Sequence, residues 1–496
     1  MTTLIKNVQL FRGDGSGAER KDVLVSGQKI SAIGSFSDRI AADIYDGQGA
    51  YLSPGWIDFH NEADHQALSI KNMHHSEILK QGVTTVVGGH DGVSLAPASI
   101  NSLRYFRNWG GEAHGINWKS FSQFLSFWDK SHLAVNFGSL VGYSSLRAMI
   151  CGGHYAPCSG QKMNTLLVLL KDSLISGAAG LSVDLHLGHN SGQFLREIEK
   201  VAKVLNEKNK ILVLDISPNS FAIRKDLLLW LKNIPCRIVV NNIMAMGGKE
   251  DALLKELFRL DNVYLEYPMG AQDLPIFRFM PEWFLQNPEL NWKSLQDPWI
   301  KNRVLKDMPA VSGKDTRIVR TRHSPALVGL TISEYAKHCD FKDTKEALLY
   351  LASSTYGQTA ISKAPRRSYP HWLGSPKVVF SGQSARVAIE SREHPGLWHG
   401  DRQPAEFMAT LINSKVLSMS EAISKMTYLP AKLLNMAGQG MVQEGFSANF
   451  TLFEVQPGPR RKDKILIKAV FVNGKLAWEK DSGVVNSKLG IAVKSN

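Results

Sequence analysis

The chain has 496 residues, and its hydrophobic share of 44% is typical of a globular protein with a substantial core, which excludes a disordered chain. The formal net charge is +13, but the basic residues are spread along the sequence, which excludes a basic arm and gives nucleic-acid binding little support. No secretion signal and no membrane-length apolar run is evident, so the sequence predicts a cytoplasmic protein without a membrane partner. Its four cysteines lack metal or redox spacing and are expected to be free thiols, although Cys151 and Cys158 could pair.

The two ends of the chain are predicted to form β-strands. They combine β-branched residues with glycine-containing turns, and Asn473-Gly474 is a strong signal for a tight hairpin. We therefore expect residues 1–50 and 436–496 to form one composite β-sandwich domain. The segments that carry this pattern are residues 4–10, 22–34, 44–52, 449–454 and 467–478.

The segment 51–64 has the pattern of a buried strand that ends in polar side chains. Its apolar part is broken by a Pro-Gly pair, resumes, and is followed by Asp58, His60 and Glu62. Alternate residues of an extended strand face the same side, so an imidazole and two carboxylates would point together. This arrangement is a plausible cation site at the end of a strand.

The middle of the chain, residues 51–435, alternates apolar strand-like segments with helical patterns. That order predicts parallel strands joined by crossover helices, and over this length it favours a (β/α)8 barrel, an α/β fold. Residues 272–321 are rich in Trp, Phe and Pro, break the rhythm, and are expected to form an insertion over the barrel mouth. The strand-like segments are 84–89, 134–142, 180–184, 211–215, 237–242 and 378–381, and helices are expected at 163–176 and 192–208.

Several motifs, in order from end to end, resemble those of one family. Pro54-Gly-Trp-Ile-Asp-Phe-His60 resembles the first-strand motif of the amidohydrolase superfamily, and Gln81–Pro97 is similar to a motif of its D-aminoacylase (N-acyl-D-amino-acid deacylase) branch. Further similar segments are 140–147, 177–182, 422–431 and 440–449. The resemblance implies a divalent metal, zinc in the family, and hydrolysis of an amide or cyclic-amide C–N bond in a small N-acylated amino-acid-like substrate.

The alignment with this family also shows substitutions at the metal-ligand positions. The second histidine of the first-strand motif is Glu62, the ligating cysteine falls on Asp91, and two further histidines fall on Asp215 and Asn242. Catalytic zinc favours imidazole and thiolate, whereas oxygen-rich sites suit harder cations. We therefore predict that His60, Glu62, Asp91 and Asp215 could hold Mn²⁺ or Mg²⁺ rather than a zinc ion of the family type.

The remaining roles follow from the same resemblance. The family's general-base aspartate has no clear counterpart, so Glu390, or Asp91, is assigned to proton transfer. Tyr143 stands where the motif of segment 140–147 has a histidine, and we assign it with Arg147 to substrate binding. An arginine typically meets the substrate carboxylate in this branch; Arg147 and Arg322 are the candidates, and salt-bridge roles are equally open to them.

Two alternatives to a metal-dependent hydrolase stay open. The first is a catalytically inactive homologue that binds a ligand or serves as a scaffold, in which Asp91 and Asp215 only cap turns. The second is a metal-independent enzyme that uses these two aspartates as an acid and base pair. Other imidazoles could act as replacement ligands: His90 next to Asp91, and His186 and His189 after a strand end.

Overall fold

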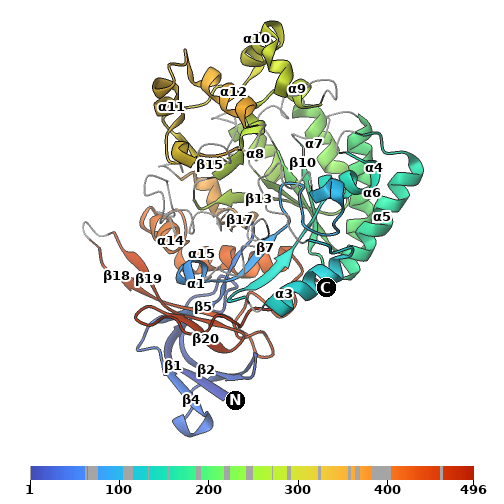
Figure 1. The fold of residues 1–496 in the computed structure, drawn as a ribbon. Helices are drawn as coiled ribbons and strands as arrows, with labels where there is room; N and C mark the ends of the chain where they lie inside the picture. The colour runs from blue at the N-terminus through green and yellow to red at the C-terminus, as the bar shows by residue number, and fades with distance from the viewer. Residues whose placement is uncertain are drawn as a thin grey trace.

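A computed structural model gives the fold of the protein (Figure 1). The described residues are 2–61, 64, 76–103, 116–131, 133–153, 156–185, 192–216, 224–241, 250–270, 272–286, 292–321, 325–355, 359–363, 369–382, 404–458 and 462–496. In this part of the chain, no helix is both long and apolar enough to cross a membrane.

Strands from both chain ends share one nine-stranded sheet, at the bottom of Figure 1. The two ends meet where β18 pairs antiparallel with β5. The predicted hairpin turn is confirmed, because Asn473 and Gly474 both have positive φ between paired strands β19 and β20. The strands are β1 (Thr2–Leu10), β2 (Glu19–Ser26), β3 (Lys29–Gly34), β4 (Asp43–Asp46), β5 (Tyr51–Pro54), β18 (Phe450–Gln456), β19 (Lys464–Val472), β20 (Lys475–Glu479) and β21 (Gly483–Val484), with the short 3-10 helix η1 (Asp38–Ile40) between β3 and β4.

The middle of the chain contains two sheets whose strands all run parallel. The first sheet is β6-β7-β8 and the second is β17-β13-β12-β11-β10-β9, and only Leu140 separates β8 from β9. The outer strands β17 and β6 approach each other, since the Gly382 N–H donates to Asp58 Oδ1 over 2.6 Å. The strands are β6 (Trp56–Asp58), β7 (Val83–Gly88), β8 (Asn136–Ser139), β9 (Val141–Gly142), β10 (Gly180–Asp184), β11 (Ile211–Asp215), β12 (Arg237–Asn241), β13 (Val263–Pro268) and β17 (Val378–Ser381).

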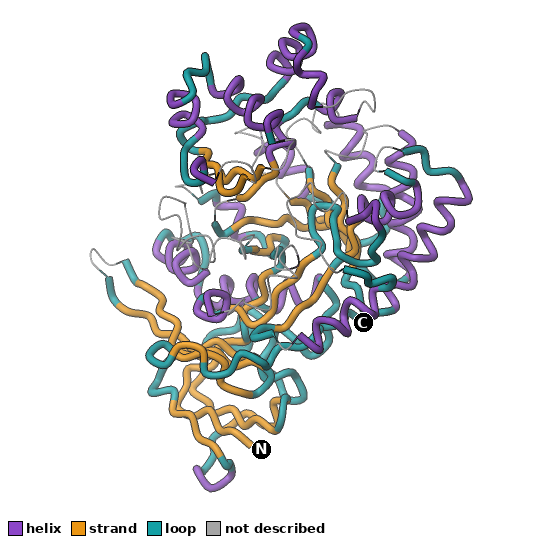
Figure 2. The backbone as a smooth tube through the Cα atoms, viewed as in Figure 1, coloured by secondary structure: helices purple, strands orange, loops and turns teal. Residues whose placement is uncertain are grey.

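Helices follow most of these strands and pack outside them (Figure 2). The strands are buried on both faces, as expected for parallel strands covered by helices, and this explains their nearly continuous apolar sequences. Polar residues stand at the carboxyl ends of these strands, where they face the candidate metal centre. The helices are α1 (Ser76–Lys80), α3 (Phe121–Ser131), α4 (Tyr143–Cys151), α5 (Gly160–Ile175), α6 (Gly192–Glu207), α7 (Arg224–Asn233), α8 (Glu250–Phe258), α14 (Pro404–Asn413), α15 (Met419–Met426) and α16 (Tyr428–Leu433).

The segment between β13 and β17 forms a unit with its own sheet and core. Strands β14, β16 and β15 make a small antiparallel sheet, and residues such as Ile276, Val304 and Leu348 form a separate buried cluster. The unit runs from β14 to β16, so its elements continue beyond residue 321. Its elements are β14 (Gln272–Pro275), η6 (Ile276–Phe279), α9 (Glu282–Gln286), η7 (Trp292–Gln296), α10 (Pro298–Asp307), β15 (Thr316–Thr321), η8 (Pro325–Leu327), α11 (Ile332–His338), α12 (Thr344–Ser354) and β16 (Thr359–Lys363), and η9 (His371–Gly374) leads into β17.

Candidate metal centre

His60 and Glu266 meet near the carboxyl ends of the parallel strands. His60 lies two residues after the end of β6 and Glu266 lies within β13, and both side chains are buried. The His60 Nδ1 atom lies 2.9 Å from Glu266 Oε1 and 3.2 Å from the Nδ2 atom of Asn241. The Ser381 hydroxyl donates to the same carboxylate oxygen over 2.6 Å. Strands that are distant in sequence therefore fix the orientation of this imidazole and this carboxylate.

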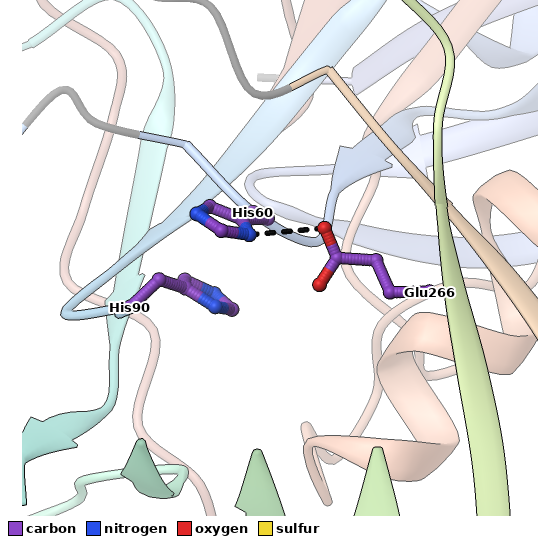
Figure 3. A group of neighbouring side chains, drawn as sticks. All are labelled: His60, His90 and Glu266. Atoms are coloured by element: carbon purple, nitrogen blue, oxygen red, sulfur yellow. Dashed lines mark hydrogen bonds and ion pairs between the residues drawn. The ribbon is translucent and has the colours of Figure 1, made fainter. Parts of the chain in front are cut away.

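His90 faces the same pair from the loop after β7 (Figure 3). Its ring stacks on the His60 ring, with centroids 3.9 Å apart and an interplanar angle of 11°. The His90 Nε2 atom is 2.8 Å from the Phe59 carbonyl oxygen, which can only accept, so Nε2 carries the proton. The buried Nδ1 atom has no hydrogen-bond partner in the described part of the chain. It therefore presents a lone pair to the site.

Asp58 holds the segment that carries His60. Its Oδ1 accepts from the backbone N–H groups of His60 and Gly382, and its Oδ2 accepts from the Asn61 amide over 2.7 Å. Burial raises the pKa of Asp58 to about 6. These contacts make Asp58 a support for the local backbone rather than a group that reaches the site.

The side chains of His60, His90 and Glu266 fit a divalent metal. One ligand atom from each residue can be chosen so that all three lie within 4.8 Å of one another, and all three residues are buried. Two imidazoles and one carboxylate are a donor set found at catalytic zinc sites. In addition, His90 donates its other ring N–H to a backbone carbonyl, as metal-ligating histidines commonly do.

The charges of the three residues depend on one another. Burial lowers the pKa of His60, but the carboxylates of Glu266 and Asp91 outweigh it and hold that pKa well above the usual value. Burial and the nearby His60 cation lower the pKa of His90 to about 3, so His90 is neutral. Burial raises the pKa of Glu266, but the charge of His60 outweighs this effect and lowers it. Neutral His90 and ionised Glu266 are the forms that bind a metal.

A second group of charges adjoins the first. Asp91 follows His90, Asp184 ends β10 and Asp215 ends β11, and each of these aspartates is at least nine-tenths buried. Arg278, from η6, reaches all three: its Nη2 atom is 3.1 Å from Asp184 Oδ2 and 3.6 Å from Asp91 Oδ1, and it forms a short ion pair with Asp215. We call these four residues the acid–arginine cluster.

Asp91 joins the two groups. Its Oδ2 lies 3.7 Å from His60 Nε2, and its backbone adopts a left-handed conformation with φ of 56°, followed by Gly92 with φ of 73°. Burial raises the pKa of Asp91, but the positive charges of His60 and Arg278 outweigh it and hold this pKa well below its usual range. Asp91 is therefore ionised.

Tyr143 and Arg147, both predicted to bind substrate, lie in α4 and contact a buried glutamate. Glu197 accepts from the Tyr143 hydroxyl over 2.8 Å and forms a short ion pair with Arg147, whose Nη2 also donates to the Ala156 carbonyl. The salt-bridge alternative for Arg147 thus has a defined partner, and the role in substrate binding stays a prediction. Nearby, Cys151 and Cys158 are free thiols with sulfur atoms 2.7 Å apart.

The structure brings part of the predicted site together. His60 and Asp91 are neighbours, and Asp215 joins them through Arg278, whereas Glu62 and Glu390 lie outside the described residues. Also outside them are Asn242, Arg322 and two of the proposed replacement ligands, His186 and His189.

Sequence reasoning missed Glu266, Asp184 and Arg278. Glu266 stands inside the apolar segment Val263–Pro268 and Asp184 ends another such segment, so an acid within or at the end of a buried strand was a usable signal. Arg278 gave no such signal, because its position depends on how the inserted unit folds back.

Comparisons with solved structures show which known proteins share this fold. No family model matches the sequence. A D-aminoacylase mutant in complex with copper chloride has a TM-score of 0.76 at 23% identity, and an N-acyl-D-glutamate deacylase from Bordetella bronchiseptica, complexed with zinc and a phosphonate inhibitor, has 0.74 at 20%; each match covers 99% of both chains. The chain therefore shares its fold with these D-aminoacylase and deacylase structures.

Proteins of known activity also match the chain by sequence over nearly its full length. The chain is 23% identical over 497 residues to a D-aminoacylase of Alcaligenes xylosoxydans xylosoxydans, covering 97% of this chain and 95% of the relative. It is 24% identical over 504 residues to an N-acyl-D-aspartate deacylase of the same organism, covering 96% and 92%. Its homologues are D-aminoacylases and N-acyl-D-amino-acid deacylases, which confirms the resemblance inferred from the motifs.

Proposed function

We propose that this protein is a metal-dependent hydrolase that cleaves an amide-type C–N bond in a small N-acylated amino-acid-like substrate. The supporting scaffold in this proposal is a closed (β/α)8 barrel with a small β-sandwich domain from both chain ends. The observation that carries the proposal is the buried group of His60, His90 and Glu266 at the carboxyl ends of the strands. Active sites of barrel enzymes lie at this end.

In this proposal, His60, His90 and Glu266 hold the metal. The group contains two imidazole donors, so it is richer in nitrogen than the predicted cage of His60, Glu62, Asp91 and Asp215, and it favours zinc over Mn²⁺ or Mg²⁺. A bound divalent cation would lower the pKa of a water molecule and polarise the scissile carbonyl. Glu266 and the Phe59 carbonyl would keep the two imidazoles in orientation.

Proton transfer is assigned to Asp91. The positive charges of His60 and Arg278 hold the pKa of Asp91 well below its usual range, so Asp91 is in the ionised form that can accept a proton. Its carboxylate lies 3.7 Å from His60 Nε2, within reach of a group bound beside that ring. Glu390 remains a predicted partner in this step, and Tyr143 and Arg147 remain predicted substrate contacts.

The test is metal analysis of the purified protein together with a substrate screen. We expect about one divalent cation per chain after dialysis, and its loss in His90→Ala, because this change removes a ligand without removing a charge. His338→Ala, in an exposed helix end, is the matched control. The loaded protein should hydrolyse N-acyl-D-amino acids. A chain that binds neither zinc nor manganese, or that binds them equally well without His90, would contradict the proposal.

A second candidate is a catalytically inactive homologue that binds a ligand or serves as a scaffold. Arg278 favours this candidate, because its cation already pairs with Asp184 and Asp215. In the motif alignment, Asp215 stands where the family has a metal-ligating histidine. This candidate predicts that the thermal midpoint responds to a ligand but not to metal or chelator, since only a species that binds the folded state stabilises it. A chelator-induced fall in the midpoint would argue against it.

A further inference from the structure

The acid–arginine cluster poses an electrostatic problem that the proposed hydrolase does not explain. Asp91, Asp184 and Asp215 come from three separate strand ends, yet their carboxylates converge in a buried space. Buried like charges repel one another and lose hydration, so the group needs a counter-charge. Ions of the solvent would be one source, and a basic side chain is another.

Arg278 supplies that counter-charge with suitable geometry. Its Nη2 atom reaches all three acids, at 3.1 Å from Asp184, 3.6 Å from Asp91 and in a short ion pair with Asp215. A guanidinium is planar, stays protonated and presents several donors to carboxylates. Only 9% of Arg278 is exposed, so its charge is not dispersed by water.

The inserted unit holds the arginine in this position. Arg278 belongs to η6, whose neighbours Ile276 and Phe277 are 0% and 7% exposed. Ile276 is part of the unit's own core, while Phe277 packs in the main core of the protein. Both flanking side chains are therefore anchored, and η6 cannot withdraw Arg278 without exposing them.

We propose that Arg278 is a built-in cation that takes the place of a divalent metal among Asp91, Asp184 and Asp215, and so confines metal binding to the neighbouring His60, His90 and Glu266. Arg278 is then a positioning residue, which acts through the carboxylates it holds. The confinement to a single subsite rests on the proposed metal-dependent function, whereas the filling of the acid group by Arg278 stands on the ion pairs alone.

The experiment compares metal binding in four proteins: the full-length wild type, Arg278→Met, Arg278→Lys and the double variant Arg278→Met/Asp215→Asn. Each is dialysed against Zn²⁺ or Mn²⁺ and measured by ICP-MS and isothermal titration, with circular dichroism as a check on folding. Methionine keeps much of the length of the side chain without its charge, and lysine keeps the charge. The double variant removes one of the acids that would bind an added ion.

We expect Arg278→Met to bind about one more cation per chain than the wild type, because three converging carboxylates that have lost the charge of Arg278 form an oxygen-rich site. Arg278→Lys should keep the wild-type stoichiometry, and Asp215→Asn should abolish the gain in the methionine background. Loss of packing alone would not produce this pattern. If Arg278→Met folds only when a divalent cation is present, that dependence supports the same conclusion.

The opposite results would overturn the inference. A folded Arg278→Met variant with the wild-type stoichiometry would show that the acids need no cation, and a gain of metal in Arg278→Lys would show that charge is not the reason. A wild type that binds two cations per chain would also refute it. If the wild type binds no metal but Arg278→Met binds one, the proposed hydrolase fails while the filling of the acid group by Arg278 holds.

Discussion

The Glu197 cluster and the group of His60, His90 and Glu266 are both buried, but they differ in how completely their members are paired. In the first, Glu197 is held by both Arg147 and Tyr143, and a single carboxylate meets a single cation. In the second, which consists of His60, His90 and Glu266, the Nδ1 atom of His90 has no hydrogen-bond partner among the described residues. A cluster whose polar atoms are all paired stabilises the fold, whereas a cluster with an unpaired lone pair is suited to bind a ligand.

The largest effect should come from breaking the first cluster. Glu197→Ala leaves the Arg147 guanidinium buried without its carboxylate, and we expect a loss of about 3–5 kcal/mol in the free energy of unfolding. Urea denaturation at neutral pH measures this loss. The exposed pair Lys171–Glu207, 3.7 Å apart, provides the control, because Glu207→Ala should cost less than about 1 kcal/mol. Equal losses in the two variants would contradict the distinction.

The next effect concerns the second cluster and is read out as metal affinity. Glu266→Gln keeps the shape of the side chain but removes the charge that faces His60, and we expect zinc to bind about 100-fold more weakly, or about 3 kcal/mol. Isothermal titration with Zn²⁺ measures this change. Glu197→Gln is the matched control, since it removes a buried charge from the other cluster and should leave the affinity unchanged. A similar weakening in both variants would mean that the effect is not local.

A smaller effect should follow from the support of Glu266. Ser381→Ala removes the hydroxyl that donates to Glu266 Oε1 over 2.6 Å, and we expect about 10-fold weaker zinc binding because an unsupported carboxylate is less well oriented. The same titration measures it. Ser173→Ala serves as a control, since its hydroxyl donates to the Leu169 carbonyl inside α5. An unchanged affinity in Ser381→Ala would show that Glu266 does not depend on this contact.

Local sequence patterns predicted the secondary structure around these clusters. The apolar segments at 180–184 and 211–215 are strands with the same bounds, because a short β-branched and leucine-rich segment between polar residues has few other ways to be buried. The Asn473-Gly474 turn was equally local. The pairing of β14 with β16 is not local, because it joins residues that lie 85 to 91 positions apart in the chain and no local signal encodes it.

The composition of the site was predictable only in part, for a similar reason. His60 and Asp91 follow strands directly, so their place at the carboxyl ends could be inferred. Whether an acid at such a place meets a metal, a histidine or an arginine depends on side chains from other strands. Asp215 pairs with Arg278. This arginine belongs to a unit whose position is set by the packing of Ile276 and Phe277.

The smallest effect tests whether the hydrogen bond between Tyr143 and Glu197 stabilises the folded protein. Tyr143→Phe removes the hydroxyl that donates to Glu197 and should cost about 1 kcal/mol at pH 7. Burial and the Glu197 charge hold the pKa of Tyr143 well above 10, so the folded protein keeps this proton after the unfolded chain has lost it. The stability that Tyr143 provides is therefore fully present below pH 10 and declines above it.

Urea denaturation of the wild type and of Tyr143→Phe between pH 7 and about pH 11 checks this sign. The advantage of the wild type should be constant up to about pH 9 and shrink above pH 10. Tyr350→Phe, at a position that is 54% exposed, should change stability by less than about 0.5 kcal/mol throughout. An advantage that grew above pH 10 would mean that the cluster tolerates a second negative charge beside Glu197, which one arginine in a buried site is not expected to neutralise.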